Sequence, residues 1–107
     1  MMKRILFLAP ILLLAGTSIG HAGPGMTGKQ VFDKHCSHCH NPGIGHPGTM
    51  QLARTRGQDQ AVLEQRDNLA PEYVKYIVRH GLNAMPPFKP SNITREELDA
   101  LADYLSK

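Results

Sequence analysis

Apolar residues recur at helical spacing in three parts of the chain, and no segment alternates convincingly as a strand. The helix nearest the C-terminus has the clearest start, because Thr94 is a suitable N-cap and Glu97 completes a capping box. Ile93 precedes the cap and is spaced to pack on Leu98 as a hydrophobic staple. The apolar face of this helix consists of Leu98, Leu101, Ala102 and Leu105, with Tyr104 beside it.

A second helix is expected near the start of the mature sequence. Thr27 and Gln30 are spaced as a capping box. The helical stripe that follows runs into Cys36 and consists of Val31, Phe32 and His35.

The third helix is expected to begin at Pro71 and Glu72, which suit a first helical turn. Gly81 ends it. Its apolar positions are Tyr73, Val74, Ile77 and Val78.

The pattern is weaker in the middle of the chain. The stretch from Asn41 to Gly48 is too rich in glycine and proline for a helix or strand, so we expect a loop. The residues from Asp59 to Glu64 are expected to form a short extra turn or helix. No internal repeat is present. The chain is therefore expected to be all-α, with three to five helices in one small domain.

Residues 1–22 have the pattern of an export signal. Two basic residues precede an apolar run from Ile5 to Ala15, and small residues precede the expected cleavage site after Ala22. The run is shorter than the roughly 20 residues that span a bilayer, and Pro10 interrupts it, which argues against an uncleaved anchor. We expect a mature domain of residues 23–107, a periplasmic location and no stable membrane insertion.

The mature chain is expected to be nearly neutral. The sequence has 12 lysines and arginines against 9 aspartates and glutamates, and Lys3 and Arg4 leave with the signal. Near-neutrality gives no indication of nucleic-acid binding. A domain of this length buries only a small core, so a large apolar cofactor would add much to its stability.

The segment Cys36-Ser37-His38-Cys39-His40 matches C-x-x-C-H, the attachment sequence for c-type haem. On one helical turn both thiols can form thioethers with one porphyrin, which places His40 beneath the iron. Structural zinc is usually closed by ligands from two separated segments. A thioredoxin-like cysteine pair would follow a βαβ pattern, which is not visible. The motif therefore favours one covalent haem c, with His35 and His38 as ordinary exposed histidines.

Met85 is the candidate for the second axial ligand of the iron. It lies in a loop after the third helix, and two prolines directly after it stiffen the backbone around a weak thioether ligand. Histidine with methionine is a frequent ligand pair of haem electron carriers. The rivals are Met50 and His46 in the weakly patterned middle of the chain, and His80, which is more typical of a surface or packing position.

Together these features resemble the class I c-type cytochromes. The resemblance is carried by Gly28 and Phe32 before the haem motif, by the methionine-proline loop at Met85, and by Leu101-x-x-Tyr104-Leu105. It covers essentially all of the mature chain. It implies an all-α fold around one haem, in which the first and last helices cross near the haem edge. Gly28, Phe32 and Tyr104 match the residues that allow this close approach.

A narrower resemblance is to the small cytochrome subunits of flavocytochromes such as 4-cresol dehydrogenase (hydroxylating). It is carried by the stretches from Val62 to Arg66, from Pro71 to Gly81 and from Ala84 to Phe88. Residues 48–61 are extra relative to that pattern. The resemblance implies a flavoprotein dehydrogenase of phenols as electron donor, with another cytochrome or a copper protein as acceptor.

The family resemblance also implies supporting contacts. A ring nitrogen of the axial histidine donates to a proline carbonyl in the loop after the motif, and Pro47 is the nearest candidate. Arg66 is the candidate for pairing with a haem propionate, with Arg54 and Arg56 as alternatives. With both axial positions of the iron filled, the expected function is single-electron transfer and not catalysis.

Three functions therefore remain: a subunit of a flavoprotein dehydrogenase, a freely diffusing electron shuttle, and a haem sensor with a labile sixth ligand. For the first two we expect a docking surface around the residues from Met85 to Phe88. Lys75, Arg79 and Lys89 would supply its charged rim.

Overall fold

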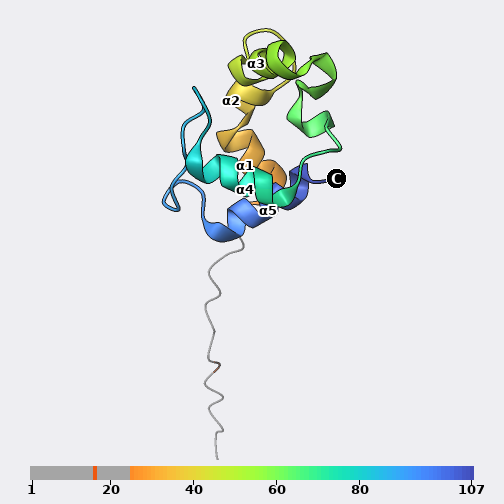
Figure 1. Ribbon diagram of the computed structural model, residues 1–107. Helices are drawn as coiled ribbons and strands as arrows, with labels where there is room; N and C mark the ends of the chain where they lie inside the picture. Colours follow the sequence, from red (N-terminus) through yellow and green to blue (C-terminus); the bar gives the residue numbers. More distant parts are fainter. Residues whose placement is uncertain (1–15, 17–24) are drawn as a thin grey trace, which may run out of the picture.

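The computed structural model describes Gly16 and residues 25–107 (Figure 1). The predicted signal peptide therefore falls outside the described residues. Residues 25–107 form five α-helices and two single 3₁₀ turns, with no strand among them, which confirms the all-α prediction. These are α1 (Gly28–His35), α2 (Ser37–His40), α3 (Pro47–Arg56), η1 (Gln58–Gln60), η2 (Leu63–Gln65), α4 (Pro71–His80) and α5 (Arg95–Leu105). No helix in this part of the chain is long and apolar enough to cross a membrane.

Two capping boxes set the starts of α1 and α5. The Thr27 hydroxyl accepts from the Gln30 amide at 3.2 Å, and the Gln30 side chain accepts from the Thr27 amide at 2.9 Å. Thr94 and Glu97 form the same pair of bonds, at 3.2 and 3.0 Å. Both boxes confirm the sequence prediction. They stabilise the helix starts because they satisfy backbone amides that have no partner inside the helix.

The helices α1 and α5 cross at Gly28. A Cβ atom at this position would lie 2.2 Å from the Ala100 carbonyl oxygen and 2.5 Å from the Tyr104 Cβ, so no other residue fits here without a shift of the backbone. One turn later the buried Phe32 ring meets the Tyr104 ring, with centroids 6.3 Å apart and planes tilted by 59°. The close crossing implied by the family resemblance is therefore confirmed.

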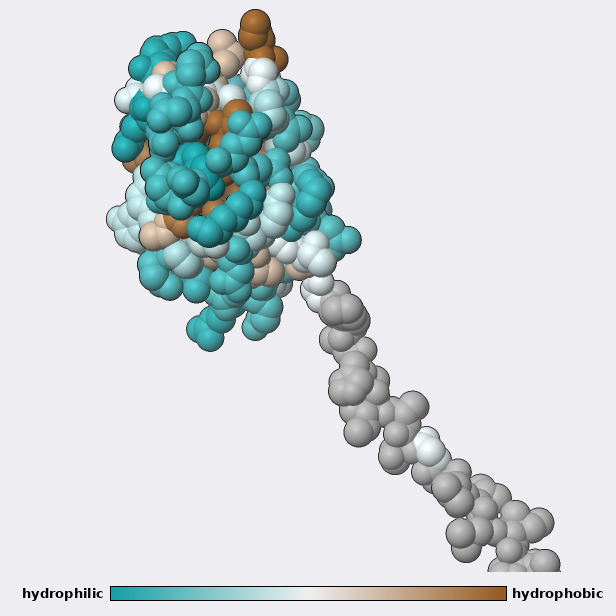
Figure 2. Space-filling view, turned by 90° about the vertical axis from the view of Figure 1, so that its right-hand side faces the viewer, coloured by the Kyte–Doolittle hydropathy of each residue, from teal (hydrophilic) through white to brown (hydrophobic). Residues whose placement is uncertain are grey.

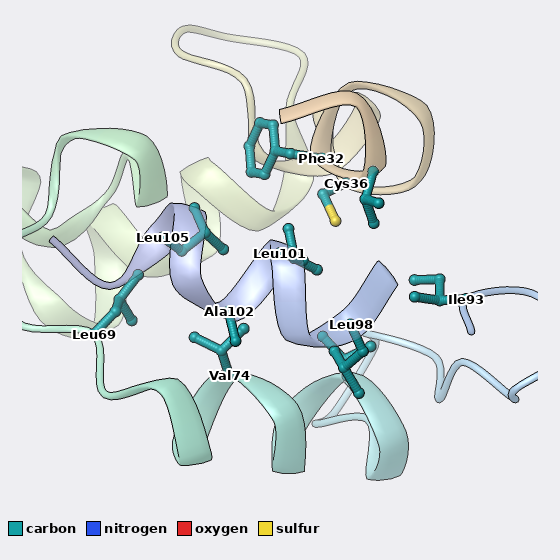
Figure 3. Packing of buried hydrophobic residues seen from close by; sticks show 11 residues of the cluster. Phe32, Cys36, Leu69, Val74, Ile93, Leu98, Leu101, Ala102 and Leu105 are labelled. Atoms are coloured by element: carbon teal, nitrogen blue, oxygen red, sulfur yellow. The ribbon is translucent and has the colours of Figure 1, made fainter. Parts of the chain in front are cut away.

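The core lies where α1 and α4 pack against α5 (Figure 3). Cys36, at the end of α1, belongs to this cluster and turns its sulfur towards α5 (Figure 3). The haem motif thus begins inside the main core. The buried cluster consists of Val31, Phe32, Cys36, Leu69, Val74, Val78, Ile93, Leu98, Leu101, Ala102 and Leu105.

The helix α3 begins inside the segment that was predicted to be a loop. It begins at Pro47, so the loop ends at His46, two residues earlier than predicted, and Gly48 is helical. Proline is favoured at the first helical position because its φ angle is already suitable and its missing N–H is not needed there. Thr49, the one buried polar residue in the described part of the chain, donates to the Asn41 carbonyl at 2.8 Å. Met50 therefore lies in an ordered helix and not in a weakly structured segment.

Tyr104 joins α5 to η2. Its hydroxyl donates to the Glu64 carboxylate. Lys29 on α1 lies 3.9 Å from the same carboxylate. The hydrogen bond to Glu64, followed by burial, raises the pKa of Tyr104 to about 12. The hydroxyl therefore stays protonated and able to donate throughout the neutral range.

Gly28→Ala tests the crossing. Alanine favours a helix over glycine, so any loss of stability must come from the contact with Ala100. We expect a loss of about 1–3 kcal/mol in the unfolding free energy of the haem-loaded protein, measured by denaturant titration. Gly25→Ala is the control, since its Cβ would meet only the Glu97 side chain at 3.7 Å. Equal effects of the two substitutions would contradict the close crossing.

Candidate functional site

The motif cysteines occupy the turn between α1 and α2. The Cys36 amide donates to the Phe32 carbonyl at 2.8 Å and closes α1. The Cys36 carbonyl then accepts from the amides of Cys39 and His40, at 3.2 and 3.0 Å. This turn holds both thiols and the histidine on adjoining backbone. Both cysteines are free, Cys36 buried and Cys39 exposed.

The pKa of the Cys36 thiol is not that of a reactive cysteine. Burial, with a smaller contribution from Cys39, raises the pKa of Cys36 to about 12. Reactive C-x-x-C pairs instead have a lowered cysteine pKa, because the thiolate is the nucleophile. Within the described residues, no group of three or more His, Cys, Asp and Glu side chains is arranged to hold a metal ion. The raised pKa of Cys36 therefore argues against a thioredoxin-like pair.

The His40 ring lies against the start of α3. A Cβ atom at Gly48 would lie 2.6 Å from the His40 Cε1 and 2.8 Å from the Cys39 carbonyl oxygen, so glycine is required for this contact. The His40 Nδ1 is buried and has no hydrogen-bond partner. Burial lowers the pKa of His40, which keeps the imidazole neutral, as a metal ligand must be. The carbonyl of Pro47, next to Gly48, remains a prediction as the acceptor for this nitrogen.

A hollow of about 330 Å³ brings two of the candidate arginines together. Arg56 and Arg66 both line it, whereas Arg54 does not. The Arg66 Nε donates to the Asn68 side chain at 3.0 Å. Figure 2 shows one face of the domain, on which apolar surface lies recessed between polar side chains. The lining residues of the hollow are Leu52, Arg56, Arg66, Asn68, Leu69, Ala70, Tyr73 and Leu82.

Met85 lies in a tight turn after α4 and packs against the main core. Leu82, which lines the hollow beside the arginines, exchanges two backbone hydrogen bonds with Met85, at 3.1 and 2.9 Å. Gly81 has a φ of 73°, and a Cβ there would lie 2.6 Å from the Met85 carbonyl oxygen. The close turn therefore depends on a glycine.

The Met85 loop reaches the haem motif through Phe88. The Phe88 ring stands edge-on to the ring of His35, with centroids 5.9 Å apart and planes at 74°. His35 directly precedes Cys36, so the two predicted halves of the site are neighbours in the structure. The prediction that His35 is an ordinary exposed histidine is wrong, since its Nε2 is buried without a partner. The contact between His35 and Phe88 could not be predicted from sequence spacing, because the two residues lie in distant segments of the chain.

The three rival candidates for the second iron ligand, Met50, His46 and His80, have different surroundings. Met50 lines a separate hollow of about 210 Å³ between the loop after the motif and η1. The His46 Nδ1 is bonded to the His38 carbonyl at 2.9 Å. His80 is exposed and stacks on Tyr76, with centroids 4.1 Å apart, which confirms its expected surface position. Met85 remains the predicted second ligand of the iron.

Two of the three predicted rim charges make contacts within the chain. Lys75 lies 3.1 Å from Asp99 of α5, and the hydrogen bond to Asp99 raises the pKa of Lys75. Arg79 donates to the carbonyls of Phe88 and Ile93. The Arg79 bonds are partly buried, whereas the ion pair between Lys75 and Asp99 lies on the surface.

Known proteins with similar sequences are c-type cytochromes. The family model described as cytochrome c oxidase, cbb3-type, subunit III matches residues 23–105. The cytochrome c subunit of 4-cresol dehydrogenase [hydroxylating] from Pseudomonas putida is 38% identical over 96 residues, which cover 90% of this chain and 72% of the relative. Cytochrome c6 from Thermosynechococcus vestitus is 32% identical over 108 residues, covering 98% of this chain and 91% of the relative.

A solved structure shows the same similarity in three dimensions. A chain in the crystal structure of p-cresol methylhydroxylase with substrate bound matches with a TM-score of 0.54 and 38% identity. The match covers 76% of this chain and 90% of that one. The chain therefore belongs to this family of c-type cytochromes, whose members are electron carriers with covalently attached haem c.

Proposed function

We propose that the mature chain is a periplasmic mono-haem carrier that accepts single electrons from a flavoprotein dehydrogenase. The observation that carries the proposal is the site itself. The motif turn presents two free thiols and a neutral His40 ring, and the loop with Met85 closes against the same turn through Phe88. The export pattern of residues 1–22 supports the location.

The residues fit a covalent haem in distinct roles. Cys36 and Cys39 would form the thioethers, and His40 and Met85 would hold the iron. The buried His40 Nδ1 has no partner, which leaves it ready to donate to the Pro47 carbonyl and so fix the ring. Arg66 remains our candidate for a propionate.

Arg56 is the better of the two alternative partners for a propionate. It lines the hollow together with Arg66, whereas Arg54 on the same helix does not. A guanidinium suits a carboxylate because its planar donors match the two oxygens.

A bound haem supplies the exchange of one electron between ferric and ferrous iron. The chain supplies the conditions for it. If a haem lies in the hollow, apolar side chains such as Leu52 and Leu69 would shield it from water, which favours the less charged ferrous state. A neutral thioether from Met85 acts in the same direction. With His40 and Met85 both holding its iron, a haem bound here would supply electron exchange and not catalysis.

The proposed donor is supported by the relatives. Two of them, the Pseudomonas putida subunit and the p-cresol methylhydroxylase chain, are named for enzymes that act on a cresol, and each is 38% identical to this chain. The name of cytochrome c6 mentions no dehydrogenase, so a carrier without a dedicated dehydrogenase is the alternative. Another cytochrome or a copper protein remains the proposed acceptor. Lys89 is the exposed rim charge next to the Met85 loop.

The covalent attachment gives the first functional prediction. Haem should stay on the chain through denaturing electrophoresis and acidic ketone extraction, and thiol titration should find no free cysteine. Cys36→Ala should lower the yield of folded protein more than Cys39→Ala, because Cys36 is also part of the buried core. Ser37→Ala is the control within the same turn. Haem that is extracted intact by ketone would contradict covalent attachment.

The assignment of Met85 as an iron ligand gives the second functional prediction. Met85→Ala should abolish the weak near-infrared sulfur-to-iron band of the ferric protein and open the iron to azide. Met50→Ala should change neither, because Met50 lines the other hollow. The assignment is wrong if the band follows Met50 instead.

The proposed docking surface near Lys89 gives the third functional prediction. In stopped-flow reduction by a phenol-oxidising flavoprotein, Lys89→Glu should alter the second-order rate constant and its salt dependence with an unchanged haem spectrum. Arg54→Glu makes the same charge change on α3 and should have a smaller effect. Equal rates for the two variants at every ionic strength would remove Lys89 from the docking surface.

A further inference from the structure

The backbone of the Met85 loop is secured near α4 by a short set of hydrogen bonds. Leu82 and Met85 bond to each other, and the Phe88 amide donates to the Val78 carbonyl at 2.7 Å. Prolines 86 and 87 lie between these points and contribute no N–H group. The first half of the loop is therefore closed at Met85 and again at Phe88.

The second half of the loop forms its own turn. The amides of Asn92 and Ile93 both donate to the Lys89 carbonyl, at 2.8 and 3.0 Å, and the Lys89 amide donates to the Asn92 side chain at 3.1 Å. These bonds are internal to the turn. They shape it but do not attach it to a helix.

Arg79 of α4 attaches this turn to the domain. Its Nη1 donates to the Phe88 carbonyl at 3.2 Å and to the Ile93 carbonyl at 2.8 Å, and both bonds are partly buried. One guanidinium thus holds both ends of the second turn, and Phe88 is also where the first half of the loop ends. The ion pairs of the described residues do not include Arg79, so its charge is directed at these two carbonyls.

An arginine is well suited to this position. The guanidinium is always charged and planar, and it keeps its donors in a fixed arrangement. A lysine carries its charge at the end of a flexible stem, so it would hold the two carbonyls less firmly. Hydrogen bonds to a charged donor are also stronger than neutral ones.

We propose that Arg79 is a positioning residue for Met85. By holding the carbonyls of Phe88 and Ile93 on α4, it keeps the Met85 loop closed against the turn that carries Cys36. A thioether binds iron weakly, so the stability of the closed loop decides how often the ligand is in place. This inference rests on the proposed assignment of Met85 as the iron ligand.

The test compares Arg79→Gln with Arg95→Gln in the ferric, haem-loaded protein. Arg95 is an exposed arginine in the first turn of α5 and is the matched control. Imidazole is the probe, because it binds iron only when the loop has opened. We expect imidazole affinity to rise at least tenfold in Arg79→Gln, since apparent affinity follows the fraction of open loop. Arg95→Gln should match the wild type. Arg79→Lys should fall between Arg79→Gln and the wild type.

Thermal unfolding of the same samples separates positioning from general stability. A lower melting temperature with wild-type imidazole affinity in Arg79→Gln would overturn the proposal. If Arg79→Gln does not accumulate with haem, the imidazole affinity of Arg79→Lys is measured instead. An increased affinity supports the proposal, and a wild-type affinity overturns it.

Met85→Ala separates this inference from the proposed function. If Met85→Ala raises imidazole affinity and the Arg79 variants do not, the ligand assignment stands and the role of Arg79 is wrong. If Met85→Ala leaves the affinity unchanged, the ligand assignment itself fails and the role of Arg79 fails with it.

Discussion

The crossing of α1 and α5 at Gly28 determines where the rest of the site lies. Gly28, Phe32 and Cys36 are spaced four residues apart, so they share the face of α1 that meets α5. The absence of a side chain at Gly28 sets the distance between the helices, because the Ala100 carbonyl occupies that space. Phe32 then fills the gap one turn later. Cys36 enters the core on the same face, and the motif turn begins from there.

The two halves of the site are secured by different kinds of interaction. The motif half is anchored by the core through Cys36, and Gly48 of α3 fits against the His40 ring. Under the proposed function it also carries both covalent bonds. The Met85 half has no such bonds and depends on close backbone contact at Gly81, on the Phe88 ring and on the side chain of Arg79. The second half is therefore where local opening is easiest, and ligand exchange would begin there.

The parts of the fold that were predicted from the sequence depend on residues close together in the chain. The capping box of Thr94 and Glu97 is complete within four residues, and the motif spacing is fixed within one turn. The helix α3 was missed because glycine and proline at its start suggested a loop. Its support comes from the Thr49 bond to Asn41, eight residues away. The His35 contact with Phe88 joins segments more than fifty residues apart, and no local sequence pattern predicts it.

Spectroelectrochemical titration of the purified protein tests the central claim, a carrier of single electrons at one haem, most directly. The account predicts one reversible transition in the haem spectrum, with a slope of about 59 mV per tenfold change in the ratio of oxidised to reduced protein, as for a one-electron couple. A transition of about 30 mV per tenfold change, without a haem spectrum, would identify a two-electron thiol–disulfide couple of Cys36 and Cys39 and would contradict the account.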